Sequence, residues 1–243
     1  MARIFNTIRQ RLLAQNRLTR YLVYAVGEIV LVVIGILIAL QLNNWNADQK
    51  LINEELALLA EMRQNLERDL DDCRSNIASN QRWQRSQEIV LNHLEQATPF
   101  HDSLRYYYGN IFGATQLTAN SSAYDNLKSI GFNLISNDSL RRAITTLYSE
   151  RYTFLRNTEI ELDIHMQLED MAPHIYEKLV MDTVWKSAYP IDLESLRNDN
   201  AFKGTLRMNI WIRGFQIMLY KDIEERIIQL IAMIDEELEN RKE

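Results

Sequence analysis

The longest apolar run of the chain extends from Tyr21 to Leu42 and has the sequence YLVYAVGEIVLVVIGILIALQL. A helix that crosses a bilayer needs about 20 consecutive apolar residues, so this run is long enough to span one. The apolar region of a cleaved signal peptide is shorter, about 7–15 residues, and no small-residue cleavage pattern follows this run. We therefore predict an uncleaved transmembrane helix over residues 21–42.

Beyond the apolar run, hydrophobic positions recur every three to five residues as far as Glu95, and neither proline nor glycine interrupts them. This spacing is typical of one face of an amphipathic helix. We predict a long helix that continues from the membrane helix and ends at Ala97-Thr98-Pro99, because the residue before a proline disfavours helical geometry. The positions that define this face are Leu51, Leu56, Leu59, Met62, Leu66, Leu70, Cys73 and Ile77.

The rest of the chain predicts two further long helices. Asn137-Asp138-Ser139 provides N-cap chemistry for a helix that runs to about Met171. Pro173 is expected to break or kink this helix. Asp199 is expected to cap the last helix, which runs to about Glu239. Shorter helices are expected at 103–112, 122–130 and 175–181, and alternating strand patterns are absent outside 133–136. The apolar face of the first of these two long helices is expected at Leu140, Ile144, Leu147, Tyr148, Tyr152, Leu155, Ile160, Ile164 and Leu168.

These patterns predict an all-α fold, in which an N-terminal transmembrane helix continues into an antiparallel periplasmic bundle of three long helices plus short ones. The expected domains are a basic segment over 1–20, the membrane helix over 21–42 and the bundle over 43–243. Residues 1–20 are either an amphipathic helix on the cytoplasmic leaflet or a frayed tail.

Charge orients the predicted membrane helix. Five arginines and no acidic residue precede it, so the positive-inside rule places the N-terminus in the cytoplasm. The whole chain has 27 basic and 33 acidic residues, and setting aside those five arginines and Glu28 leaves 22 against 32 on the far side. This acidic excess argues against nucleic acid as a partner. The five arginines are Arg3, Arg9, Arg11, Arg17 and Arg20.

The run from Tyr24 to Gln41, followed by Asn43-Asn44-Trp45-Asn46, resembles the opening signature of DUF6090, an uncharacterised family of single-pass membrane proteins of Bacteroidota. A second stretch resembles the middle segment of that family. It comprises Ser122-Ala123-Tyr124, Leu127-Lys128-Ser129 and Asn137-Asp138-Ser139-Leu140. The resemblance implies a bacterial inner membrane and a periplasmic large domain, and it brings no established activity.

Catalytic motifs are absent from the sequence, which lacks G-x-S-x-G, a phosphate-binding glycine loop, H-E-x-x-H and paired Glu-x-x-His. The densest metal-ligand candidate is Glu161 with His165 and Glu169, but a run of charge on a helix is more often solvated surface. We therefore expect no enzyme activity, no cofactor and no metal site. The lone Cys73 cannot form an internal disulfide, so cysteine usage does not indicate whether the protein is in a reducing or an oxidising compartment.

A binding surface is expected between the long helices, where loops and aromatic residues concentrate. Its candidate residues are Tyr106, Tyr107, Tyr108 and Tyr124. Loops mounted on rigid helices often carry binding sites. The alternative is packing, with the rings buried and the hydroxyl groups at the surface.

Glu28 is an ionisable residue inside the predicted membrane helix. Such residues usually face a helix interface or a wet path, because a charge in hydrocarbon costs several kcal/mol. At 100° per residue, Glu28, Val32, Gly35 and Ala39 lie on one stripe, and Gly35-x-x-x-Ala39 is a pattern that lets membrane helices approach closely. Glu28 could hydrogen-bond across an oligomer interface, line an ion or proton path, or reach towards the cytoplasmic interface.

These observations predict a membrane-anchored periplasmic protein that self-associates through its span and has a sensing, scaffolding or binding role in the cell envelope. The alternative is an oligomeric ion or proton channel, or a force-coupling subunit, with Glu28 lining the path. A third class is an enzyme with its site in residues 100–136. The expected partners are the lipid bilayer, further copies of the chain and other envelope proteins, without nucleic acid.

Overall fold

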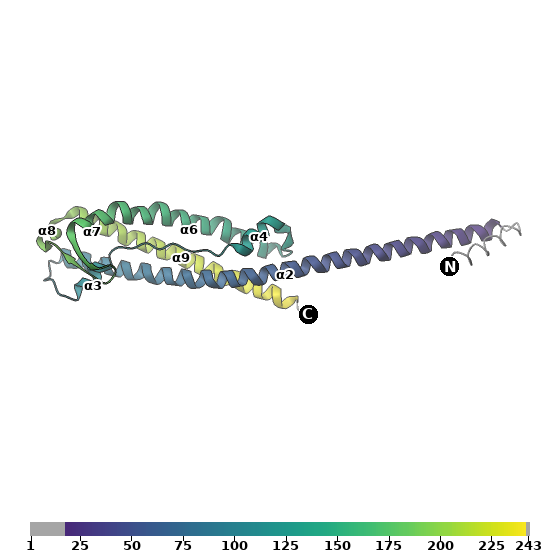
Figure 1. Ribbon diagram of the computed structural model, residues 1–243, viewed down its shortest axis with the longest axis horizontal. Coiled ribbons are helices and arrows are strands. Elements are labelled where there is room, and N and C mark those ends of the chain that lie inside the picture. Colours follow the sequence, from purple (N-terminus) through teal and green to yellow (C-terminus); the bar gives the residue numbers. More distant parts are fainter. Residues whose placement is uncertain (1–17, 242–243) are drawn as a thin grey trace. The chain divides into compact units, whose positions relative to one another are not determined.

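The computed structural model describes residues 18–241 (Figure 1). The predicted basic segment therefore lies outside the described residues except for its last three positions. The first element is α2, Leu18–Glu95, a single helix of 78 residues. The continuous helix expected from the sequence is confirmed, and it ends two residues before Ala97, which has a left-handed φ of 51°. The chain forms two compact units, one up to Glu54 and the other from Glu55 onward.

The first unit carries the apolar part of α2. This stretch is long and apolar enough to cross a membrane, with a mean hydropathy of 2.7 over its best window, and none of that window is buried. Its apolar side chains are exposed from Leu22 to Leu42, except for the partly exposed Ala25. A soluble protein rarely exposes so much contiguous apolar surface, so this helix is a candidate membrane anchor.

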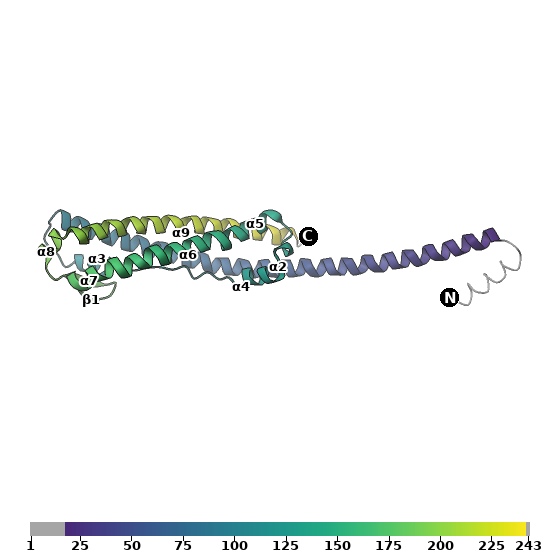
Figure 2. The ribbon, with the colours of Figure 1, turned by 90° about the horizontal axis from the view of Figure 1, so that it is seen from above.

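The second unit is a helical bundle, whose described residues form three long helices (Figures 1 and 2). The first is α2 from Glu55 and the last is α9, Asn200–Asn240. Between them in sequence lies the middle helix, the name used below for residues 138–178. Its consecutive segments are α5 (Asp138–Thr145), η2 (Thr146–Arg151), α6 (Tyr152–Thr158), η3 (Glu159–Ile164), η4 (Met166–Met171) and α7 (Ala172–Lys178).

Contacts between side chains give the directions of the helices in the bundle. Arg63 pairs with Asp235 at 2.5 Å and Arg74 with Glu224 at 2.7 Å, so α9 runs antiparallel to α2. The middle helix runs parallel to α2. Two contacts show this: the Tyr152 hydroxyl donates to Asp69 at 2.8 Å, and Ser136, just before the middle helix, donates to Glu55, the first residue of α2 in the second unit. Parallel neighbours need a long connection, and the chain returns through an extended segment that lies alongside α2 and the middle helix in Figure 1.

The predicted N-caps are confirmed. Asn137 accepts hydrogen bonds from the backbone N–H groups of Ser139 and Leu140 at the start of α5. Asp199 accepts from the N–H of Phe202 at the start of α9. Each side chain satisfies donors that have no partner within the first helical turn, which is why these helices begin where the sequence indicates.

Pro173 does not end the middle helix, contrary to the sequence-based expectation. It lies in the first turn of α7, where a missing N–H is tolerated, and the helix continues to Lys178. The helix expected over 175–181 ends early, and a hairpin follows it. The absence of strands outside 133–136 was therefore a wrong prediction. The strands are β1 (Leu179–Thr183) and β2 (Ser187–Pro190), paired antiparallel with a register shift between Met181 and Thr183.

Short helices complete the second unit, and most of them lie at positions that the sequence predicted. The helix expected over 122–130 is found with the same bounds, while the one expected over 103–112 is shorter. Residues 133–136 contribute to a turn of 3-10 helix and an extended residue instead of a strand. The short helices are α3 (Leu104–Gly109), α4 (Ser122–Ile130), η1 (Phe132–Leu134) and α8 (Leu193–Asn198).

The middle helix keeps a buried face with an unusual spacing. Buried residues recur at intervals of four from Leu155 to Ile175, by way of Glu159, Asp163, Gln167 and Met171. In a regular α-helix each such step would rotate the side chain by about 40° away from the face. The π-helical turns η3 and η4 hold more residues per turn and so keep this row directed inward. As a result Ile160 and Leu168, expected in the core, are 41% and 57% exposed.

Candidate functional site

The stripe predicted on the membrane helix is exposed along its whole length. Glu28, Val32, Gly35 and Ala39 all lie on the surface of the first unit. A Cβ atom added at Gly35 would meet no heavy atom within 4 Å, so nothing in the described chain occupies the surface beside it. The structure thus presents a carboxylate and a small-residue pair on an apolar helix without a partner among residues 18–241.

The four tyrosines predicted as a binding surface are not brought together. Tyr106 is 46% exposed and Tyr107 is partly exposed. Tyr108 is fully buried, and its hydroxyl oxygen lies 2.9 Å from Nδ1 of His93. Tyr124 belongs to the other end of the bundle, where its ring stacks on Tyr148 at a centroid distance of 4.5 Å. Both rings pack in the interior, but the Tyr108 hydroxyl is buried against His93 and does not lie at the surface, as the packing alternative expected.

A layer of buried polar side chains divides the interior of the bundle. On each long helix most of it falls between two clusters of buried apolar residues, one containing Leu66 and Ile227, the other Val90 and Phe202, and the rest lies within the adjoining ends of these clusters. We call it the polar layer. Its members are Asp69, Asn80, Gln87, Glu159, Asp163, Gln167, Asn209, Arg213 and Gln216.

The centre of the polar layer is an ion pair between Arg213 and Asp163, whose side chains are both 0% exposed. The Nη1 atom of Arg213 also donates to Oδ1 of Asn80 at 2.6 Å, and its guanidinium lies 5.3 Å from the ring centroid of Trp83. Gln167 donates to both Asp163 and Asn209, at 3.2 and 2.9 Å. A charge pair removed from water needs such additional hydrogen bonds to offset its desolvation.

A second buried carboxylate, Glu159, lies one helical turn before Asp163 and accepts a hydrogen bond from the Tyr220 hydroxyl. Its Oε1 atom also accepts from the backbone N–H of Leu117 at 2.9 Å. Its Oε2 atom has no hydrogen-bond partner in the part of the chain that the structure describes, and neither does the side-chain amide of Gln216.

The polar layer holds the extended return segment, residues 111–121, in place. This segment has no neighbouring strand, so its backbone N–H groups need other acceptors. The N–H of Leu117 donates to Glu159, that of Thr118 to Asp72 at 2.9 Å and that of Asn120 to Asp69 at 2.8 Å. The buried carboxylates of Glu159 and Asp69, together with the partly exposed Asp72, therefore act as substitutes for a partner strand, which is a structural role.

Burial controls the protonation of these groups. Burial raises the pKa of Asp69, and hydrogen bonds from Asn120 oppose this rise. Burial also raises the pKa of Glu159, and hydrogen bonds from Tyr220 and Leu117 oppose that rise. Burial also raises the pKa of Asp163 and lowers that of Arg213, while their mutual attraction opposes both shifts. The thiol of Cys73 has its pKa raised to about 12 by burial, so it is a poor nucleophile at neutral pH.

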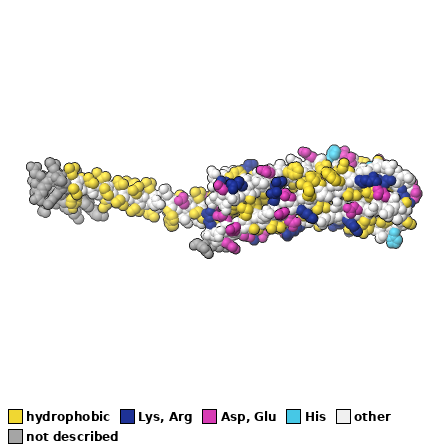
Figure 3. Space-filling view, turned by 180° about the vertical axis from the view of Figure 1, so that it is seen from behind, with side chains coloured by type: hydrophobic (Ala, Val, Ile, Leu, Met, Phe, Trp, Pro, Cys, Tyr) yellow, Lys and Arg dark blue, Asp and Glu magenta, His cyan; other side chains and the backbone are white. Residues whose placement is uncertain are grey.

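The outward face of α9 carries an exposed apolar row that sequence reasoning missed. Met208, Trp211 and Met218 are 56%, 60% and 56% exposed, and the ring of Phe215 stacks on that of Trp211 at 5.6 Å. Figure 3 shows hydrophobic side chains gathered on a face of the bundle, among charged ones. The signal was present in the spacing of these four residues, which is three, four and three, as in a heptad repeat.

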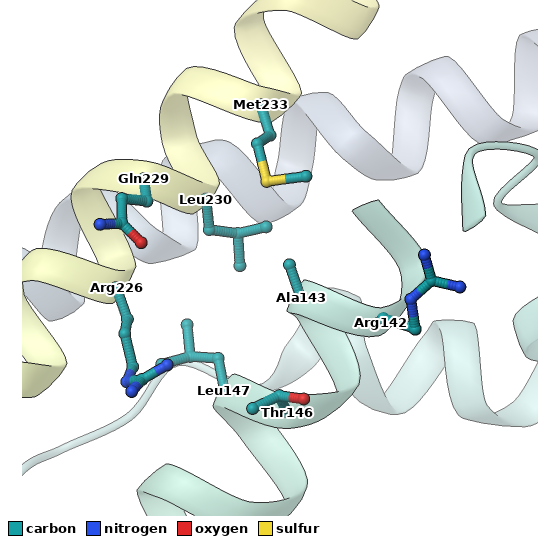
Figure 4. A pocket seen from close by; sticks show the side chains of 8 residues that line it. All are labelled: Arg142, Ala143, Thr146, Leu147, Arg226, Gln229, Leu230 and Met233. Carbon is teal, nitrogen blue, oxygen red and sulfur yellow. The ribbon is translucent and has the colours of Figure 1, made fainter. Parts of the chain in front are cut away.

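A groove of about 270 Å³ opens between the middle helix and α9. Its apolar lining is Ala143, Leu147, Leu230 and Met233, and the remaining positions are Arg142, Thr146, Arg226 and Gln229. Figure 4 shows the two arginines on different sides of the groove, with the apolar side chains between them. Sequence reasoning did not find this groove, because its residues are contributed by helices about 80 positions apart.

Metal ligands are not assembled anywhere in the described residues, since no group of three or more His, Cys, Asp or Glu side chains is placed to hold an ion. Among the metal candidates considered from sequence, Glu161, His165 and Glu169 are all exposed. The buried acids of the same stretch are Glu159 and Asp163, which the π-helical turns direct inward.

Fold and geometry together define a helical-bundle protein with one candidate membrane span. The sequence matches a family of unknown function, DUF6090, over residues 28–172, which is more than half of the chain. The chain belongs to this family, as the resemblance of the apolar run indicated. No curated protein and no solved structure matches the chain.

Proposed function

We propose that this protein is a membrane-anchored envelope protein that self-associates through its apolar helix and presents its bundle for scaffolding, sensing or binding. The observation that carries the proposal is that no residue is buried in the apolar window of α2, which includes Glu28. Lipid can cover the apolar side chains, but it offers no partner to a carboxyl group, whereas a second helix does.

The geometry of the stripe supports association with a second copy. Gly35 and Ala39 leave room for a close helix–helix approach, and Glu28 lies on the same face two turns earlier, where it can hydrogen-bond across the interface. The exposed row on α9, centred on Trp211 and Phe215, gives the bundle a second apolar surface. Tryptophan, phenylalanine and methionine are enriched in protein interfaces, which supports a binding role for this unit.

Location and orientation are part of the proposal. The five arginines before the span and the acidic excess after it support a cytoplasmic N-terminus and a periplasmic bundle. A bacterial inner membrane, which the resemblance of the apolar run implies, is part of the same proposal. We propose no catalytic activity, and hydrolysis or transfer activity in the purified full-length protein would contradict this part.

The test is the mass of the full-length protein in mild detergent, measured by light scattering across a range of protein-to-detergent ratios. We expect the wild type to form a defined oligomer. The Gly35→Leu oligomer should be weaker, so it should already dissociate at protein concentrations at which the wild-type oligomer stays intact. Glu28→Leu should weaken association by about 3- to 30-fold, as for other interhelical hydrogen bonds in membranes. The matched control is Gly27→Leu, because Gly27 is also exposed with no heavy atom near its added Cβ but lies about 100° from the stripe. A monomeric wild type, or equal effects of the two leucine substitutions, would contradict self-association through the stripe.

A second candidate function, ion or proton conduction, is favoured by the same exposed Glu28. In an oligomer this residue would form a ring of carboxyl groups along the path. Liposomes that contain the full-length protein should then conduct, and Glu28→Gln should abolish the flux without changing the oligomer mass. Absence of flux from a wild type that is oligomeric would exclude conduction and leave the scaffold proposal standing.

A further inference from the structure

The groove between the middle helix and α9 combines an apolar floor with cationic edges. Leu147 and Leu230 are buried at its base, and Met233 is partly exposed above them. Its volume of about 270 Å³ is just below the range of about 300–1,000 Å³ typical of small-molecule sites. The lining contains two arginines and no acidic side chain. This combination fits a small ligand that has an apolar body and an anionic group.

The arginines of the groove keep hydrogen-bond donors free for such a ligand. Arg226 uses its Nε atom to bind Oδ2 of Asp222 at 2.9 Å, and its two terminal nitrogens make no hydrogen bond within residues 18–241. Arg142 contacts the Ser139 hydroxyl at 3.3 Å and forms no ion pair with any described residue. A guanidinium with both terminal nitrogens available can bind a carboxylate through two parallel hydrogen bonds.

The charges around the groove favour a monoanion. Outside the lining, Asp222, Glu225 and Glu150 act on Arg226, and Arg151 acts on Asp222. This arginine neighbourhood therefore already holds three acidic side chains. A carboxylate therefore suits it better than a doubly charged phosphate, which would meet uncompensated repulsion.

Local backbone geometry marks the same place. Thr146, which lines the groove, is the first residue of the π-helical turn η2. Turns of this kind are rare within helices and often occur at functional sites, because they displace side chains from the regular helical row. Here the turn begins where the groove opens.

We propose that this groove binds a fatty-acid-type carboxylate, with its single acyl chain on Leu147, Leu230 and Met233 and its head group at Arg226, while Arg142 adds positive charge on the other side of the groove. The proposal goes beyond self-association and does not depend on it. A neutral molecule of the same length would leave the Arg226 guanidinium without a new partner and would bind less tightly.

The test uses the full-length protein in nanodiscs of phosphatidylcholine, with ¹³C-methyl-labelled methionine and octanoate as the probe. We expect the Met233 methyl resonance, assigned by its loss in Met233→Leu, to shift saturably with a dissociation constant on the order of millimolar. Octanol should bind at least about tenfold more weakly, and acetate should cause no shift, since each lacks one of the two parts of the ligand. The double variant Arg142→Gln/Arg226→Gln should weaken octanoate binding by about tenfold or more while leaving octanol binding unchanged.

Two controls make the outcome specific to the groove. The Met208 methyl group, exposed on the outward face of α9, should not shift, and Lys221→Gln should bind octanoate like the wild type, because Lys221 does not line the groove. Equal affinities for octanoate and octanol would overturn the proposal. So would equal shifts of Met233 and Met208, or an undiminished affinity of the double arginine variant. Tighter binding of octyl phosphate than of octanoate would overturn the choice of a carboxylate.

Discussion

The two units of the chain distribute polarity in opposite ways. In the first unit, apolar side chains such as Ile36 and Leu37 are exposed and more than half of their surface is accessible. In the second unit, polar and charged side chains such as Asp163 and Arg213 are completely buried. The first arrangement is unfavourable in water and favourable in lipid, whereas the second costs free energy for each buried polar group that lacks a hydrogen-bond or ion-pair partner.

This difference separates two sources of structural specificity. The apolar helix needs only length and composition to enter a bilayer, because all of its backbone hydrogen bonds lie within the helix. The bundle must also hold an extended segment between helices, and its buried carboxylates supply the acceptors for that segment. The first unit should therefore tolerate apolar exchanges, and the second should be sensitive to single polar substitutions.

The largest expected effect is at the ion pair of the polar layer. Asp163→Ala leaves the Arg213 guanidinium buried and unpaired, and we expect it to lower the free energy of unfolding by about 3–5 kcal/mol. Urea denaturation of the full-length protein, followed by tryptophan fluorescence, measures this loss. The control is Glu95→Ala, which removes an exposed ion pair with Arg207 and should cost less than about 1 kcal/mol. Equal losses in the two variants would show that the polar layer is not a specific element of the fold.

The next effect tests the first unit. Ile36→Arg places a charge near the middle of the apolar run, and we expect membrane insertion to become less favourable by about 2.5–3.5 kcal/mol. Insertion is measured as the fraction of protein that resists carbonate extraction. Ile36→Leu is the control and should insert like the wild type. If Ile36→Arg inserts equally well, this helix does not behave as a lipid-facing anchor.

A smaller effect is expected where the return segment crosses the bundle. A Cβ atom at Gly113 would lie 2.3 Å from the ring of Trp83, so Gly113→Ala must displace packed atoms. We expect a loss of about 1–3 kcal/mol in the free energy of unfolding, again by urea denaturation. At Gly204, on α9, an added Cβ meets nothing within 4 Å, so Gly204→Ala should instead stabilise by up to about 1 kcal/mol. The comparison fails if both substitutions change stability in the same direction.

The smallest effect concerns the pH dependence of stability. Burial raises the folded-state pKa of Glu159 above its ordinary value of 4.5, so its protonated form favours the folded state. That stabilisation is fully present below pH 4.5 and is lost as the pH rises through the folded-state pKa, with a slope of at most about 1.4 kcal/mol per pH unit. Glu159→Gln should therefore lose less stability than the wild type when the pH is raised to 7 in denaturation experiments. The exposed Glu161→Gln is the control, and a steeper loss in Glu159→Gln would refute the assignment.

Sequence patterns predicted much of the fold because local physics determines it. The uninterrupted helix to Glu95 follows from the lack of proline along its length and of glycine beyond Gly35, and the caps at Asn137 and Asp199 follow from side chains that bind their own helix start. The hairpin after Lys178 was missed, because its strands have only five and four residues and pair mainly with each other. Pro173 was misjudged because a single proline suggests a break, yet the first turn of a helical segment accommodates it.

The candidate site was the least predictable part. Glu28 and its stripe could be found from sequence, because helical spacing alone places them on one face. The polar layer could not, because Glu159 and Asp163 look like surface charges until the π-helical turns direct them inward. The groove at Arg142 and Arg226 likewise exists only once two helices that are distant in sequence lie side by side.

The sequence by itself determined the apolar helix, its charge asymmetry, its family and the three long helices, since each depends on neighbours within a few turns. Only the tertiary structure decided that the middle helix runs parallel to α2, which polar groups are buried, and where the groove opens. The physical reason is that burial and hydrogen-bond satisfaction depend on contacts between residues up to 186 positions apart, as for Glu55 and Arg241. Helical periodicity contains no information about such contacts.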